Sequence, residues 1–197
     1  MEIRDGIKAF YARDRKAWRK WLANKGNKEK SVWLIIYKKE ATKKSVSYID
    51  AVEESLCFGW IDSKANKRDE ESYYQFFTKR NPASNWSKIN KERVIKLIDQ
   101  GFMNSKGMEM IEIAKGNGSW TALDKIENLE LPVDLKAALK QHPQATKYFN
   151  GFPRSVIKGI LEWIQNAKKE ETREKRIRET VSLAEENIRA NQYKPKL

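Results

Sequence analysis

A small set of polar and aromatic residues near the ends of predicted strands could form an anion-binding pocket. This candidate pocket consists of Lys38, Lys39, Trp60, Asp62, Thr78, Arg80 and Trp86. An arginine fork can grip a carboxylate or a phosphate with two parallel hydrogen bonds, and a tryptophan wall offers a surface for stacking. If the neighbouring strands pair, Asp62 and Arg80 would meet at one end of the sheet. The alternative is that the two residues form an internal ion pair that ties a hairpin together, a common role for such pairs at sheet ends.

The single cysteine and the single histidine are the other candidates for chemistry. Cys57 could be a nucleophile if a nearby cation stabilised its thiolate, but its neighbours Leu56, Phe58 and Trp60 favour burial, which raises a thiol pKa. His142 lies between two predicted helices, with no acid or nucleophile at a recognisable offset, so we expect it to face solvent or to cap a helix. One cysteine excludes an internal disulfide and a cysteine-based zinc site.

The glycines do not form a phosphate-binding loop. Gly101, Gly107, Gly116 and Gly118 lack the order GxxxxGK[ST] or GxGxxG, and they punctuate the predicted helices instead. The chain also has no HExxH motif and no serine elbow. These absences favour a protein that is not an enzyme. They do not exclude an enzyme, because acids and bases can assemble from distant segments of a chain. We expect neither a cofactor nor a metal.

The candidate pocket should belong to a small α+β domain over residues 1–86. A set of apolar residues at helical spacing predicts a first helix that ends near Gly26. These residues are Ile7, Phe10, Tyr11, Trp18, Trp21 and Leu22. Residues 31–38 form an apolar run of strand length, and a second helix, capped by Ser45 or Ser47, should end at Gly59. Residues 60–65 and 72–78 predict two further strands. The result is a sheet of about three strands with flanking helices.

From Ser87 onward the apolar residues recur at helical spacing, which predicts an all-helical domain over residues 87–192. Helices should end at Gly101 and near Gly116, and others should begin after Pro132 and at Pro153. The last predicted helix covers about residues 169–191. Its apolar face consists of Ile177, Val181, Ala184 and Ile188. The helical region could also pack with the first domain as one unit.

The chain is strongly basic, with 40 Lys and Arg against 27 Asp and Glu and a net charge of +13. Such a field attracts anionic ligands and polyanions. We therefore expect an unknown anionic ligand or a protein as partner. Nucleic acid is the second choice, because aromatic residues in the basic half offer stacking surfaces but no known nucleic-acid motif accompanies them.

The amino terminus has no apolar core of the kind that a secretion signal needs. The longest apolar run, residues 32–37, is far shorter than the roughly 20 residues of a transmembrane segment. A single cysteine suits a reducing compartment. We therefore expect a cytoplasmic protein with no transmembrane segment.

Short motifs are spread over nearly the whole chain. They include Trp18-x-x-Trp21-Leu22, Phe77-Thr78-Lys79-Arg80, Pro153-Arg154-Ser155 and Glu171-Thr172-Arg173. In this order they resemble the bacteriocin-protection, YdeI/OmpD-associated family. The resemblance implies tolerance of bacteriocins or cationic antimicrobial peptides and an association with an outer-membrane porin, but no reaction, cofactor or catalytic residue. A porin lies outside the cytoplasmic membrane and the sequence shows no export signal, so we do not carry the porin association over.

These observations together favour a non-enzymatic cytoplasmic binding protein with a role in tolerance of bacteriocins, cationic antimicrobial peptides or envelope stress. The alternatives are a basic nucleic-acid-binding protein and an enzyme of unassigned reaction.

Overall fold

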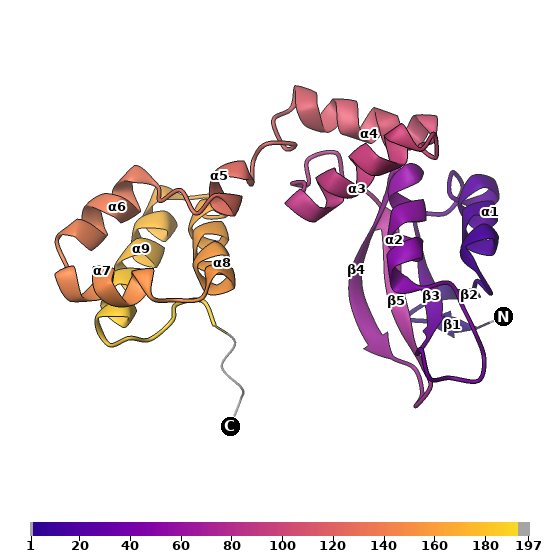
Figure 1. The fold of residues 1–197 in the computed structure, drawn as a ribbon, viewed down its shortest axis with the longest axis horizontal. Helices are drawn as coiled ribbons and strands as arrows, with labels where there is room; N and C mark the ends of the chain where they lie inside the picture. Colours follow the sequence, from indigo (N-terminus) through magenta and orange to yellow (C-terminus); the bar gives the residue numbers. More distant parts are fainter. Residues whose placement is uncertain (1, 193–197) are drawn as a thin grey trace. The chain divides into compact units, whose positions relative to one another are not determined.

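The strands form one sheet near the amino terminus of this computed structural model, which describes residues 2–192. They are β1 (Ile3–Arg4), β2 (Ile7–Tyr11), β3 (Ser31–Tyr37), β4 (Trp60–Lys67) and β5 (Ser72–Lys79), in the order β1-β2-β3-β5-β4 across the sheet (Figure 1). β2 runs parallel to β3, and the other neighbours are antiparallel. The fold is mixed α+β, as predicted, but within the described residues the sheet has five strands rather than about three.

The two extra strands lie where the sequence predicted the start of the first helix. Ile7–Tyr11 is a strand because Asp5 and Gly6, with φ angles of 51° and 74°, turn the chain back from β1. An Asp-Gly pair with two positive φ angles is typical of a two-residue hairpin. The helix, α1 (Arg15–Lys25), begins only after Asp14, whose side chain caps it. The helical spacing of the aromatic residues led to the wrong prediction.

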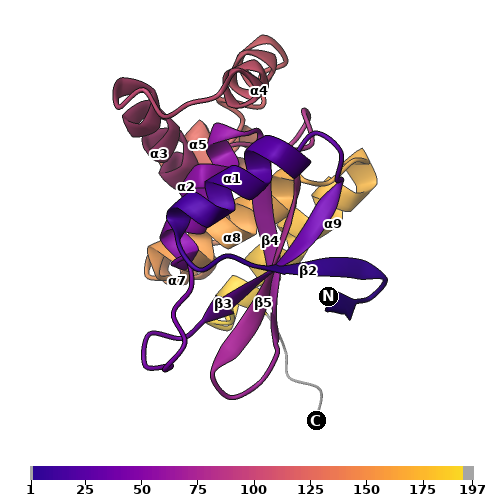
Figure 2. The ribbon, with the colours of Figure 1, turned by 90° about the vertical axis from the view of Figure 1, so that its right-hand side faces the viewer.

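Two helices, α1 and α2 (Tyr48–Cys57), pack together on one face of the sheet (Figure 2). Ser47 caps α2, because its hydroxyl oxygen accepts a hydrogen bond from Asp50 N. The main residues of the core beneath the helices are Trp18, Leu22, Leu34, Val52, Leu56, Trp60 and Phe77. The predicted second helix and the three predicted strands are thus confirmed in place.

Two further helices, α3 (Lys88–Asp99) and α4 (Ser105–Gly116), pack against α2. α4 approaches the carboxyl end of α2 closely, since a Cβ on Gly107 would lie 2.7 Å from Leu56 O. The chain divides into compact units after Thr121, into Met1–Thr121 and Ala122–Leu197. The boundary predicted from the sequence lies after residue 86, and α3 and α4 lie between the two boundaries.

The second unit is helical throughout its described part. Its helices are α5 (Asp124–Glu127), α6 (Val133–Lys140), α7 (Pro143–Asn150), α8 (Arg154–Gln165) and α9 (Glu170–Glu185), around a core that includes Leu135, Phe149, Ile160, Ile164 and Val181. The last helix ends at Glu185, six residues before the predicted end near 191, so Ile188 lies outside it and is 42% exposed. No described helix combines the length and the apolar character that crossing a bilayer requires.

Candidate functional site

The structure separates the predicted pocket residues into two groups. Trp60 and Arg80 line one cavity, and Trp86 lies against the Arg80 side chain. Lys38 and Lys39 line a different hollow, between the end of β3 and the start of α2. The two groups therefore do not form one pocket.

Asp62 and Arg80 do not meet. Asp62 faces Phe77 across the β4–β5 ladder, and its carboxylate accepts a hydrogen bond of 2.7 Å from the Tyr48 hydroxyl. Arg80 follows the last residue of β5, where its backbone N–H donates to Gly59 O. Burial and the Asp62 carboxylate raise the pKa of Tyr48 to about 12. The expected Asp62–Arg80 contact is replaced by a bond from Asp62 to α2, and Thr78 lies within the ladder opposite Ser31 and Ile61.

The cavity beside Arg80 has a volume of about 440 Å³. It is bounded by the loop after α1, the corner between α2 and β4, the end of β5 and the first turns of α4. The residues that line it are Gly26, Asn27, Phe58, Gly59, Trp60, Lys79, Arg80, Lys106, Glu109 and Met110. Its size falls within the range of small-molecule sites.

The Arg80 guanidinium is buried, charged and incompletely bonded. The side chain is 6% exposed, and its central carbon lies 3.7 Å from the centre of the Trp86 ring. Nη2 donates to Asn85 O at 2.6 Å and more weakly to Ser84 O at 3.4 Å. Nε has no hydrogen-bond partner in the described chain, and no carboxylate lies within ion-pair distance of the guanidinium there. Burial lowers the pKa of Arg80 to about 10.

Two glycines allow the walls of the cavity to come together. Gly59 has a φ of 72°, and a Cβ there would lie 3.0 Å from both Lys106 O and Met110 Cγ. At Gly26 a Cβ would clash with the backbone of α1 and would lie 3.3 Å from Trp60 Nε1. A side chain at either position would push α4 or the loop after α1 away from the cavity.

The other charged side chains of the lining differ in how they are neutralised. Lys106 Nζ lies 3.0 Å from Glu109 Oε2, so these two charges cancel. Lys79 Nζ donates to a neutral acceptor, Asn27 O, at 2.9 Å. The lining therefore carries an excess of positive charge from Lys79 and Arg80. This arrangement can bind an anion.

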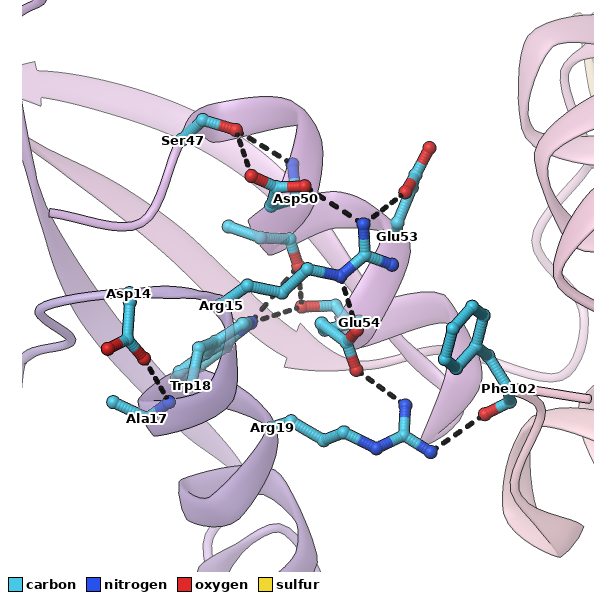
Figure 3. Close-up of polar contacts among 12 residues, drawn as sticks. Asp14, Arg15, Ala17, Trp18, Arg19, Ser47, Asp50, Glu53, Glu54 and Phe102 are labelled. Atoms are coloured by element: carbon cyan, nitrogen blue, oxygen red, sulfur yellow. Dashed lines mark hydrogen bonds and ion pairs between the residues drawn. The ribbon is translucent and has the colours of Figure 1, made fainter. Parts of the chain in front are cut away.

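The largest cluster of ion pairs lies elsewhere, between α1 and α2 (Figure 3). Glu54 is only 2% exposed and accepts hydrogen bonds from Arg15 Nε at 2.6 Å and Arg19 Nη1 at 2.7 Å. Arg15 Nη1 also bonds Asp50 and Glu53, both at 2.9 Å. Each acid of the cluster has an arginine partner, and within the described residues no group of acids, His or Cys could hold a metal ion. The cluster holds the two helices together.

Sequence reasoning missed this cluster, although a signal was present. Arg15 and Arg19 are four residues apart on α1, and Asp50, Glu53 and Glu54 recur at helical spacing on α2. Such spacing places each set on one helix face. The two faces could be matched only if the packing of α1 on α2 was known.

Cys57 and His142 make contacts that support the fold. Cys57 is fully buried, and burial raises its thiol pKa to about 11, which confirms the expected core position. His142 precedes α7, and its Nδ1 lies 2.7 Å from Glu185 Oε1 on α9. This acid is distant in the sequence, so no local offset could reveal it.

Comparison with known proteins gives two family matches. Residues 10–110 match a domain of unknown function (DUF8412), and residues 128–187 match the family described as Bacteriocin-protection, YdeI or OmpD-Associated. Arg80 and its cavity lie in the first match, and α6 to α9 lie in the second. No curated protein and no solved structure matches the chain.

Proposed function

We propose that this chain, which belongs to the DUF8412 family and matches the bacteriocin-protection, YdeI or OmpD-associated family over residues 128–187, is a non-enzymatic protein that binds a small anion at Arg80. Its role is tolerance of bacteriocins, cationic antimicrobial peptides or envelope stress. The proposed compartment is the cytoplasm, where the free thiol of Cys57 stays reduced.

One observation carries the binding proposal, namely a buried arginine that has no carboxylate partner among the described residues and lines a cavity. An isolated charge that leaves water loses several kcal/mol of hydration unless a partner replaces it. In a purely structural role, a carboxylate of the same fold would supply that partner, as Glu54 does for Arg15 and Arg19. Around Arg80 no carboxylate of the described residues takes this role, and the side chain lines a cavity that can admit an anion.

Anion binding can be tested through thermal stability. A ligand that binds only the folded state adds about 2.7 kcal/mol at a concentration a hundredfold above its Kd. We expect phosphate, sulfate or acetate to raise the melting temperature of the wild-type protein and of Lys96→Met, which removes an exposed charge outside the cavity. The same anions should have no effect on Arg80→Met. Equal shifts in all three proteins would contradict a site at Arg80.

The cellular role needs a separate measurement. A strain without the gene, complemented by the wild type, Lys96→Met or Arg80→Met, is exposed to bacteriocins and to polymyxin. We expect the first two proteins to restore survival and Arg80→Met to fail. Unchanged survival of the deletion strain across several agents would refute the role in tolerance and would leave the binding site untouched.

A second candidate function is binding of single-stranded nucleic acid on the sheet face opposite the helices. There Lys43 Nζ lies 4.1 Å from the centre of the half-buried Tyr11 ring, and Lys64 Nζ lies 5.7 Å from that of the half-buried Phe76 ring. Aromatic rings beside lysines offer both stacking and phosphate contacts. Titration of a generic oligonucleotide at several salt concentrations tests this function. Affinity that does not fall as salt rises would count against it.

A further inference from the structure

We propose that the anion bound at Arg80 is the phosphoryl group of a small phosphate monoester rather than a carboxylate. This inference rests on the proposed function, because it names the ligand class of the same cavity. Three features of the lining support it: its charge, the fixed plane of its arginine and its apolar wall.

The uncompensated charge of the lining matches a dianion. Lys106 and Glu109 neutralise each other across 3.0 Å, which leaves Arg80 and Lys79. Neither makes an ion pair with an acid of the described chain, and Lys79 Nζ contacts only a backbone carbonyl. A phosphate monoester carries a charge of about −1.5 to −2 at neutral pH. A carboxylate would balance only one of the two cations.

The way the two cations are held also suits a phosphoryl group. Stacking on Trp86 and the bond from Nη2 to Asn85 O fix the plane of the Arg80 guanidinium. An arginine held in this way bonds oxyanions directionally, whereas a lysine such as Lys79 acts on a phosphate as a point charge. A phosphoryl group has three terminal oxygens to share between them, and a carboxylate has two.

The rest of the cavity fits the organic part of an ester. Phe58, Trp60 and Met110 provide apolar and aromatic surface beside the charged end. A volume of about 440 Å³ holds a small molecule, not a polymer chain. The ligand class is therefore a low-molecular-weight phosphate monoester with an apolar or aromatic body.

The test compares phenyl phosphate with benzoate, which share the ring and differ in the acid. By titration calorimetry at pH 7.5 and low salt, we expect phenyl phosphate to bind the wild-type protein at least roughly tenfold more tightly. At pH 5.0 the ester lies below its second pKa of about 6 and loses most of its second charge, so this advantage should shrink. Benzoate stays ionised at both pH values, and its affinity should change little.

Substitutions of Lys79 and Arg80 show how much each cation contributes to the affinity for the two probes. Lys79→Met should weaken phenyl phosphate roughly tenfold and benzoate much less, because only the dianion uses the second cation. Arg80→Met should abolish binding of both probes, and Lys96→Met should change neither. Arg80→Lys, which keeps the charge and loses the planar fork, should weaken both. Circular dichroism confirms that each variant is folded.

The outcomes separate the two proposals. Benzoate binding as tightly as phenyl phosphate, with both lost in Arg80→Met, would overturn the phosphoryl assignment and leave the anion site standing. A preference for phenyl phosphate that survives Lys79→Met unchanged would also overturn the assignment. Failure of both probes to bind the wild type, or binding that is unaffected by Arg80→Met, would overturn the anion site as well.

Discussion

Replacement of Arg80 by methionine should leave the protein without its ligand and yet nearly as stable as the wild type. Methionine keeps the unbranched shape and the contact with Trp86 and removes the charge. Burial lowers the pKa of Arg80 from its ordinary value to about 10, which corresponds to roughly 3 kcal/mol of lost stability at neutral pH. Removal of the charge recovers this free energy.

The substitution also removes favourable contacts. The charged hydrogen bond to Asn85 O contributes about 1.5–3 kcal/mol, and the cation lying over Trp86 contributes up to about 2 kcal/mol. Gain and loss nearly cancel, so we expect the free energy of unfolding to change by less than about 1 kcal/mol. If Arg80 belonged to a buried ion pair, removal of one partner would cost about 3–5 kcal/mol.

The assay is urea unfolding at pH 7, followed by tryptophan fluorescence. Six of the seven tryptophans, all except Trp163, lie in the first unit, so the signal reports mainly on the part of the chain that contains Arg80. The folded pKa of Arg80 lies below the unfolded one, so the penalty is complete at neutral pH and diminishes as the pH rises above about 10. In that pH range the free energy of unfolding of the wild type should therefore rise relative to that of Arg80→Met. A loss of 3 kcal/mol or more at pH 7 would refute the reasoning.

Three other predictions concern the core and the second unit. Cys57, with a thiol pKa raised from 9.0 to about 11, should react with iodoacetamide at pH 8 at least about a hundredfold more slowly in the folded protein than in urea, and equal rates would contradict its burial. Glu54→Gln should destabilise the first unit by about 3 kcal/mol in urea unfolding, because Arg15 and Arg19 lose a buried partner. The control Glu70→Gln, at an exposed ion pair, should cost less than about 1 kcal/mol. Similar costs for the two substitutions would mean that the cluster contributes little to stability. Deletion of residues 169–197 removes α9, whose large buried apolar side chains contribute about 1.5–3 kcal/mol each to stability. Calorimetry of the truncated protein should therefore show no cooperative unfolding transition for the second unit. An unchanged transition would show that α9 does not belong to the core of that unit.

The sequence predicted those elements whose signals are local. β3 is a continuous apolar run, Ser47 caps α2, and Gly59 with its positive φ follows that helix. β2 was mistaken for a helix because its aromatic residues also satisfy a helical period, and the Asp-Gly turn before it was the better guide. Short apolar segments remain ambiguous when spacing is the only evidence.

The candidate site could be predicted only in part, for a similar reason. Arg80, Trp86 and Trp60 are close in sequence or lie on paired strands, and the structure brings them together. Asp62 was assigned to the same place because the register of β4 on β5 was unknown. The wall formed by α4 comes from residues far along the chain, and no local pattern reveals where a helix will pack.

The close contact between α4 and α2 at Gly107 has a consequence for how the site can evolve. The two helices meet through backbone atoms, so the position of α4 depends little on the side chains that it presents to the cavity. Substitutions at Lys106, Glu109 or Met110 can therefore change the charge and shape of the lining while the wall itself stays in place. A family that shares this contact could diversify its ligands without redesigning its fold, and Gly107 would be the residue that permits it.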